Sequence, residues 1–226
     1  MKLRSAKGVV AWLKLLRKGS LDRFLTDVSG VVHVGANTGQ ERKLYGKLGL
    51  DVLWIEPIPE VFAELQANLK AYPSQRAAQA LVTDRDGGQY QFNIASNNGA
   101  SSSILEFGQH GDIWPDVHFT KTVTMESVTL ATLFERERLD AGAYQALVMD
   151  TQGSELLVLE GAVPMIRKYK YIKTEVADFE AYTGCCQLSD IEAFMAKHGF
   201  VEHIRRAFAR RPEGGSCYDI VYRSDA

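Results

Sequence analysis

Short apolar segments alternate with segments of helical periodicity from about residue 30 to residue 200. This alternation is typical of a parallel β-sheet with helices packed against it. The predicted strands cover residues 31–34, 52–55, 78–82, 144–149 and 171–174. Residues 200–206 and 217–222 are predicted to close the sheet as an antiparallel hairpin. The pattern therefore predicts a doubly wound α/β domain.

Helices between these strands are indicated by capping residues and apolar stripes. Thr38 and Glu41 have the spacing of a capping box directly after the first strand, and Ser189 and Glu192 repeat that spacing near the end of the chain. Gly153 is expected to open the helix that follows residue 149. The predicted apolar stripes are Val61, Phe62, Leu65 and Leu69 in one helix, and Leu156, Leu159 and Val163 in another.

Polar and glycine residues follow the predicted strands at the point where each strand ends. Gly35 and Gly39 enclose a turn after the first strand, where the backbone can approach a ligand closely. In doubly wound sheets, ligands bind beyond the carboxyl ends of the strands. Glu56, which is 21 residues after Gly35, is then positioned to accept hydrogen bonds from both hydroxyls of a ribose. We therefore expect a cofactor that contains adenosine.

A dinucleotide fits this turn less well than a smaller adenosine cofactor. The pyrophosphate of NAD is usually held by a GxGxxG turn, but Asn37 and Gln40 replace the second and third glycines here. The doubly wound plan and Glu56 would still serve such a cofactor. An NAD-linked oxidoreductase therefore remains the second hypothesis.

Composition and charge limit the class of protein. A chain of 226 residues with 46% hydrophobic content fits a single domain over residues 1–226 that can bury a large core. The net charge of −2 provides no strong field for attracting nucleic acid. No apolar run approaches the roughly 18 residues of a membrane span, and the three cysteines lack zinc-site spacing. We expect a cytoplasmic protein with reduced thiols, no membrane span and no nucleic-acid partner.

The first part of the chain is basic. Residues 1–23 carry seven Lys or Arg against one acid, and Val9, Trp12, Leu13 and Leu16 have helical spacing. These features predict a basic amphipathic helix before a core over residues 24–226. Packing on that core, pairing in a homodimer and contact with an anionic membrane surface all remain open for this helix.

Four motifs resemble those of the FkbM-type methyltransferases: HVGANTG over residues 33–39, WIEP over 54–57, NNGASSS over 97–103 and DTQGSE over 150–155. The resemblance implies a Rossmann-like class I methyltransferase fold, with a mostly parallel seven-stranded sheet, a C-terminal antiparallel hairpin and helices on both faces. It also implies that S-adenosylmethionine is the cofactor. The expected reaction is O-methylation of a hydroxyl on a sugar, a glycan or a related natural product.

The resemblance also implies a set of cofactor-binding residues. They are His33, Gly35, Ala36, Asn37, Thr38, Gly39, Glu56, Pro57, Leu81, Val82, Thr83, Asp84, Ser102 and Ser103. Residues 81–84 would flank the adenine, and the serines would close over the cofactor. Many members carry Asp where this chain has His33, and that carboxylate would help to hold the methionine ammonium group. Asn37 or a water molecule would take its place here.

The expected catalytic residues are Asp150, Gln152 and Glu175. Asp150 ends a buried strand beside the expected position of the sulfonium and is the first candidate for accepting the proton of the acceptor hydroxyl. Its alternative role is to cap the next helix. Asp150 and Glu175 are also expected to bind Mg²⁺ together with Asp178, so that the metal polarises the acceptor oxygen.

Residues 95–125 are interpreted as an insertion that shapes the substrate pocket. His110 and His118 in that segment, together with Tyr182, are expected to contact the substrate. Solvated loop side chains are the alternative for both histidines. The basic cluster near the C-terminus, Arg205, Arg206, Arg210 and Arg211, fits either an anionic acceptor or a solvated hairpin turn. A catalytically silent partner protein that binds the cofactor is the third hypothesis.

Overall fold

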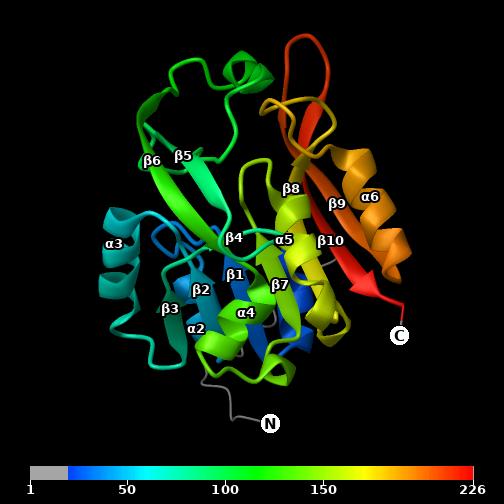
Figure 1. Cartoon of the computed structure of the whole chain (residues 1–226). Helices are drawn as coiled ribbons and strands as arrows, with labels where there is room; N and C mark the ends of the chain where they lie inside the picture. The colour runs from blue at the N-terminus through cyan, green and yellow to red at the C-terminus, as the bar shows by residue number, and fades with distance from the viewer. Residues whose placement is uncertain (1–19, 226) are drawn as a thin grey trace.

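The computed structural model describes residues 20–225 and is built around a seven-stranded sheet (Figure 1). Its strands are β1 (Gly30–Val34), β2 (Asp51–Ile55), β3 (Gln75–Ala78), β7 (Ala146–Met149), β8 (Tyr171–Ala177), β9 (Phe200–Arg210) and β10 (Ser216–Ser224). Their order across the sheet is β3-β2-β1-β7-β8-β10-β9. The first five pair in parallel, whereas β10 is antiparallel to both β8 and β9. The mostly parallel sheet and the C-terminal hairpin are confirmed.

Helices cover both faces of this sheet, so its central strands β1 and β7 are buried throughout. On one face lie η1 (Leu21–Asp27), α2 (Arg42–Leu48) and α3 (Pro59–Leu69), and on the other α4 (Leu130–Arg136), α5 (Glu155–Gly161), η4 (Val163–Lys168) and α6 (Leu188–Lys197). Alternate residues of β1 enter the two cores: Val31 packs with the α2 and α3 face, and Val32 with the α4 to α6 face. The doubly wound architecture is therefore confirmed.

A second, three-stranded sheet stands beside the main one and was not predicted. It contains β4 (Leu81–Val82), β5 (Gln89–Ala95) and β6 (Phe119–Val128) in the order β4-β6-β5. The single strand predicted over residues 78–82 is wrong. The chain leaves the main sheet after Ala78, and Leu81 and Val82 pair with β6 instead. The predicted insertion over residues 95–125 is the β5–β6 connection, which contains η2 (Gln109–Asp112), together with part of β6.

The loops at the carboxyl ends of the parallel strands meet at one end of the molecule. In Figure 1 the β5–β6 connection and the β9–β10 turn lie at the same upper end. Arg211 of the turn forms an ion pair of 2.7 Å with Asp112 of η2. The backbone N–H of Thr183 donates to the carbonyl of Glu106, so the segment after β8 joins the same assembly. This cluster of loops forms the roof of the site described below.

Several helix boundaries differ from the predictions. The capping box of Thr38 and Glu41 is not formed, because the glycine turn continues to Glu41 and α2 starts at Arg42 without a side-chain cap. Near the C-terminus, Gln187 and Asp190 form the capping box of α6 in place of Ser189 and Glu192. These helix starts are set by how the preceding loop packs, which the residue spacing does not contain.

Two further boundaries were placed wrongly. The helix after β7 starts at Glu155 rather than Gly153 and ends at Gly161, so Val163 lies outside it and is exposed. The strand predicted from residue 144 starts only at Ala146, because Tyr144 is the C-cap of the 3₁₀-helix η3 (Ala141–Ala143). Most of the basic helix predicted over residues 1–23 lies outside the described residues. Among residues 20–225, no helix combines the length and apolar character needed to cross a membrane.

Candidate functional site

The turn after β1 passes directly over the end of β7. Gly35 has a φ of +77°, and a Cβ built there would lie 1.8 Å from the backbone oxygen of Asp150. Asn37 also has a positive φ, +44°, which a residue with a Cβ adopts at some cost. The glycine predicted from the sequence is therefore required for close contact between two strand ends. The backbone strain at Asn37 lies in the same turn after β1.

Glu56, at the end of β2, closes this turn. One carboxylate oxygen accepts the backbone N–H of Asn37 at 2.8 Å, and the other accepts that of Ile58 at 2.9 Å. The side chain is only 4% exposed, and burial raises its pKa to about 7 against the opposing effect of the two backbone donors. The sequence prediction of a carboxylate beside the glycine turn is confirmed in position.

A first cavity opens between this turn, the end of β7 and β4. Nine of the predicted cofactor-binding residues line it: His33, Gly35, Ala36, Asn37, Glu56, Pro57, Leu81, Val82 and Ser102. Four other lining residues, Gln40, Glu41, Ile58 and Phe92, were not predicted to bind the cofactor. Phe92 and Ile58 pack with Leu81 into one apolar wall. Alternation of apolar residues along β5 was the signal that could have found Phe92.

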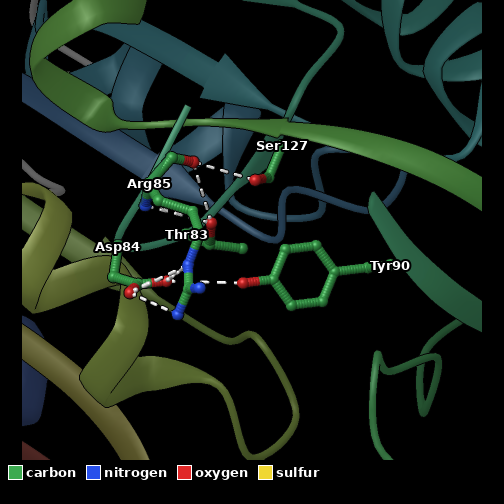
Figure 2. Close-up of polar contacts among 5 residues, drawn as sticks. All are labelled: Thr83, Asp84, Arg85, Tyr90 and Ser127. Carbon is green, nitrogen blue, oxygen red and sulfur yellow. Dashed lines mark hydrogen bonds and ion pairs between the residues drawn. The ribbon is translucent and has the colours of Figure 1, made fainter. Parts of the chain in front are cut away.

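Five predicted cofactor-binding residues do not line the first cavity: Thr38, Gly39, Thr83, Asp84 and Ser103. Thr83 is fully buried, and its backbone oxygen packs against Gly161. Figure 2 shows that the carboxylate of Asp84 instead accepts hydrogen bonds from the guanidinium of Arg85, at 3.0 Å, and from the hydroxyl of Tyr90. The side chain of Ser103 donates to the backbone oxygen of Gln152 at 2.7 Å and so supports the site from outside.

His33 lines the first cavity but cannot supply a charge to it. Its ring stacks on Trp54 at 4.8 Å, and Nδ1 lies 3.2 Å from the hydroxyl of Tyr45. Burial lowers the pKa of His33 to about 3, so the ring is neutral near pH 7. The contact that an acidic residue at this position would make is therefore not available from His33.

Asp150, Gln152 and Tyr182 form one hydrogen-bonded chain. Gln152 donates its side-chain amide to the Asp150 carboxylate, and its side-chain oxygen accepts the hydroxyl of Tyr182 at 2.6 Å. Gln152 has a φ of +53°, so the backbone is strained where the chain crosses from β7 to α5. Asp150 does not cap α5 and points into the site instead, which excludes the alternative role considered for it.

Glu155 holds the turn that contains Gln152 and was missed by the sequence analysis. It is 2% exposed, and its carboxylate accepts the backbone N–H groups of Thr151, at 2.9 Å, and of Gly153, at 3.0 Å. These two donors precede α5 and would otherwise be unpaired. The motif DTQGSE contains Glu155, but nothing in its spacing indicates that the last residue folds back on the turn.

A second cavity lies on the other side of Asp150 and Gln152, below the roof of loops. It is lined by Ala100, Ser101, His110, Trp114, Asp150, Gln152, Gly153, Glu155, Glu175, Val176, Ala177, Ala181, Tyr182, Cys185, Cys186, Phe208 and Cys217. Ala100, Asp150 and Gln152 line both cavities. Two predicted catalytic residues, Asp150 and Gln152, thus lie where the two cavities meet, and the third, Glu175, lines the second cavity.

The carboxyl groups of Glu175 and Asp150 both line the second cavity and repel each other electrostatically. Burial raises the pKa of Asp150, and burial together with the negative charge of Asp150 raises that of Glu175. Glu175 was predicted to end its strand, but β8 continues to Ala177, and Glu175 lies opposite Asp219 of β10. The backbone at Glu175 is therefore held by its pairing with β10.

The predicted magnesium site is not formed. Asp178 accepts the backbone N–H of Ser216 at 2.7 Å and the hydroxyl of Tyr218 at 3.0 Å, both from β10. No group of three or more His, Cys, Asp or Glu that could hold a metal ion occurs within residues 20–225. The continuation of β8 past Glu175 accounts for this, because it directs Asp178 to β10.

The predicted substrate residues separate into two groups. His110 and Tyr182 are buried and line the second cavity, whereas His118 is exposed and lines neither cavity. Burial lowers the pKa of His110 to about 4, and its Nδ1 has no hydrogen-bond partner among the described residues. In the basic cluster, Arg205 pairs with Glu192 and Glu202.

Solved structures with the same fold include methyltransferases. Sp1610 of Streptococcus pneumoniae, in complex with S-adenosyl-L-methionine, has a TM-score of 0.51 and 10% identity over 98% of this chain and 73% of that chain. TrmK of M. capricolum, in complex with S-adenosyl-homocysteine, has a TM-score of 0.51 and 6% identity over 91% of this chain and 67% of that chain. At these identities the likeness shows the fold alone, which confirms the class I, Rossmann-like prediction.

Sequence comparison identifies closer relatives. The 2-O-methyltransferase NoeI of Sinorhizobium fredii (strain NBRC 101917 / NGR234) is 24% identical over 162 residues, which are 68% of this chain and 65% of NoeI. The match thus spans somewhat less than two thirds of that relative. The Methyltransferase FkbM domain matches residues 33–202, from the end of β1 to the start of β9. Because this match covers most of the chain, the protein belongs to the FkbM methyltransferase family.

Proposed function

We propose that this protein transfers the methyl group of S-adenosylmethionine to a hydroxyl of a sugar or a glycan. The observation that carries the proposal is the meeting of two cavities at Asp150 and Gln152. One cavity has the features of an adenosine-binding site, and the other collects carboxylates and aromatic side chains. Such an arrangement places two ligands end to end with Asp150 between them.

The residues that line the first cavity suit the chemical groups of S-adenosylmethionine. The apolar wall with Leu81 and Phe92 would take the adenine. Glu56 uses one lone pair on each oxygen for a backbone donor and keeps others for two ribose hydroxyls. The turn at Gly35 lets the backbone approach the ligand without a Cβ. The sulfonium end would then reach Asp150.

The second cavity fits the two chemical surfaces of a sugar. Trp114 and Phe208 line it with aromatic rings, which suit the C–H face of a pyranose. Asp150 and Glu175 supply carboxylate oxygens that can accept hydrogen bonds from hydroxyls. The relative NoeI is named a 2-O-methyltransferase, which supports an oxygen acceptor. The first cavity therefore supports the choice of cofactor, and the second supports a sugar hydroxyl as the acceptor.

The protein's chemical task is to orient a hydroxyl and to remove its proton. Bound S-adenosylmethionine supplies an activated methyl group and a neutral thioether as the leaving group. Asp150 accepts the hydroxyl proton as the new oxygen–carbon bond forms and the carbon–sulfur bond breaks. Its raised pKa suits this role near neutral pH. Gln152 donates to the Asp150 carboxylate and fixes the direction of its oxygens.

The test has two stages. In the first, calorimetry measures binding of S-adenosylmethionine and, separately, of NAD to the wild type and to Glu56→Ala. Binding of S-adenosylmethionine alone, weakened in Glu56→Ala, is expected. Binding of NAD alone, or of neither ligand, would contradict the proposal.

In the second stage, methyl glycosides of hexoses and 6-deoxyhexoses are incubated with the enzyme and S-adenosylmethionine, and mass spectrometry detects methyl ethers. The variant Asp150→Asn should lose methyl transfer but still bind S-adenosylmethionine, with an affinity lowered by the loss of the charge beside the sulfonium. Cofactor binding with no methylated glycoside would instead favour a different acceptor or the silent cofactor-binding hypothesis.

A further inference from the structure

S-adenosylmethionine has an ammonium group at the end of its amino-acid arm, and the first cavity must place that group. His33 is neutral, and its ring stacks on Trp54 with Nδ1 beside the hydroxyl of Tyr45. Glu56 already accepts two backbone donors at the opposite, ribose end. Asp150 is held by Gln152 at the junction with the second cavity. The cavity has one more carboxylate in its lining, Glu41.

The electrostatic neighbours of Glu41 show on which side of the cavity it lies. Its carboxylate interacts with Lys173 of β8 and with Asp22 of η1, and it also affects Asp150 at the end of β7. Glu56 is influenced by Asp150 but not by Glu41. Because the sheet order is β2-β1-β7-β8, Glu41 lies on the β7–β8 side of the turn, across from the ribose end.

If S-adenosylmethionine lies along this edge of the sheet with its adenine at β4, its amino-acid arm would therefore reach Glu41. The adenine would lie at β4, the ribose at β2 and the sulfonium at β7, which leaves the amino-acid arm for the side on which Glu41 stands. An ammonium group placed there needs an anionic partner, because desolvating an unpaired cation is costly.

The carboxylate of Glu41 is free to take such a partner. Glu41 is exposed, and its side chain does not cap α2. Within the part of the chain that the structure describes, it forms no ion pair with a lysine or arginine. Desolvation by the surrounding protein raises the pKa of Glu41 above the ordinary value, against the opposing charges of Lys173 and Arg42, and a bound cation would lower it. Lys173 acts against a cation here, but its ammonium group is paired with Asp22, at 3.5 Å, and with Asp219, at 3.3 Å, so this group of charges as a whole remains negative and favours a cation.

We propose that Glu41 binds the ammonium group of S-adenosylmethionine and so takes over the role that His33 cannot perform. This inference rests on the proposed function, since it assumes that the first cavity binds that cofactor. It makes Glu41 a cofactor-binding residue that selects for the amino-acid arm.

Calorimetry with three ligands tests the proposal without an acceptor. S-adenosylmethionine has the whole arm, decarboxylated S-adenosylmethionine keeps the ammonium group but lacks the carboxylate, and 5′-methylthioadenosine lacks the arm. Glu41→Gln is expected to lower the affinity for the first two ligands about tenfold, which is typical of one lost charge-assisted hydrogen bond. The affinity for 5′-methylthioadenosine should not change. Glu41→Asp, which keeps the charge, should lose less affinity than Glu41→Gln.

Glu64→Gln, on the exposed side of α3, serves as the matched control and should bind all three ligands like the wild type. Equal affinities of the wild type and Glu41→Gln for S-adenosylmethionine would overturn the proposal. An equal loss of affinity for all three ligands would also overturn the proposal, because it would mean that Glu41 only shapes the cavity. A loss for S-adenosylmethionine but not for its decarboxylated form would assign Glu41 to the carboxylate and overturn it as well. Failure of the proposed function is a separate result, since the wild type itself would then not bind S-adenosylmethionine.

Discussion

The hydroxyl of Tyr182 donates a hydrogen bond of 2.6 Å to the side-chain oxygen of Gln152, a residue 30 positions away in sequence. This contact decides which end of the Gln152 amide faces Asp150. Because the oxygen is held by Tyr182, the N–H group is directed to the Asp150 carboxylate. Tyr182 therefore orients the proposed base through Gln152.

The variant Tyr182→Phe tests this relationship. It removes the bond to Gln152 and a second bond, of 3.2 Å, to the backbone oxygen of Ser101. Since the Gln152 amide could then turn over, we expect kcat to fall by about tenfold, while the Kd for S-adenosylmethionine changes by less than about twofold. Steady-state kinetics and calorimetry provide the two readouts.

Tyr169→Phe is the matched control for that variant. The hydroxyl of Tyr169 is buried and has no hydrogen-bond partner among the described residues, and Tyr169 is outside both cavities. Its removal should leave kcat unchanged and should not lower stability. If Tyr182→Phe also kept the wild-type kcat, the orienting role of Tyr182 would be refuted.

Gly35→Ala is expected to destabilise the fold strongly. The added Cβ would meet the backbone oxygen of Asp150 at 1.8 Å, and the φ of +77° is unfavourable for alanine. We expect a loss of about 3 kcal/mol or more in the free energy of unfolding, because β1 and β7 must separate. Urea denaturation measures the change.

Gly49→Ala separates the two causes of that loss. Gly49 has nearly the same φ, +70°, but nothing lies within 4 Å of an added Cβ. Backbone strain alone should then cost about 1–2 kcal/mol. Equal losses for both variants would show that the contact with Asp150 is not what requires Gly35.

The affinity for S-adenosylmethionine is expected to rise with pH. Burial raises the pKa of Glu56 to about 7, so this carboxyl is mostly protonated at pH 6 and mostly ionised at pH 8. Ribose hydroxyls donate best to the ionised form, and binding should therefore release a proton. If only that form binds, the affinity increases about tenfold over this range. Calorimetry at both pH values measures it.

The control for this pH dependence is Glu56→Ala. Asp150 also has a raised pKa and stands near the sulfonium, so its ionisation acts in the same direction. A pH dependence that persists unchanged in Glu56→Ala would assign the effect to Asp150 or another group. If the wild type binds equally well at pH 6 and pH 8, neither carboxyl controls binding.

The sequence predicted the features that depend on local patterns. Buried runs such as residues 31–34 and 52–55 mark strands on their own, and the glycine turn and Glu56 follow at fixed offsets from them. Asp150 was found for the same reason, because it directly follows a buried run. Parallel topology then brings these strand ends together.

Features that depend on contacts between distant segments were not predicted. Gln152 has a positive φ, and it is held in this conformation by hydrogen bonds from Ser103 and Tyr182, which are 49 and 30 residues away in sequence. The strand β6 alternates threonine with valine and methionine, but only its pairing with β5 separates it from a solvated loop. Asp84 follows β4 as expected, yet Arg85 and Tyr90 determine where its side chain lies.

Glu155→Gln is expected to affect both stability and catalysis. Its carboxylate accepts the backbone N–H groups of Thr151 and Gly153, and an amide would turn a second donor toward one of them. A buried donor without a partner costs about 1–3 kcal/mol, so the free energy of unfolding should fall by that amount. Because the same turn carries Gln152, kcat should fall with it. Urea denaturation and steady-state kinetics test the two effects.

Glu160→Gln, which is exposed on the same helix, makes the same chemical change without burial and should alter stability by less than about 0.5 kcal/mol. A Glu155→Gln enzyme with wild-type kcat but reduced stability would show that the turn holds its shape without this carboxylate. The orientation of Asp150 would then depend on Tyr182 and Ser103 alone. In that case the double variant Glu155→Gln/Tyr182→Phe should lose more kcat than Tyr182→Phe does. A double-mutant cycle between Tyr182 and Glu155 measures that coupling directly.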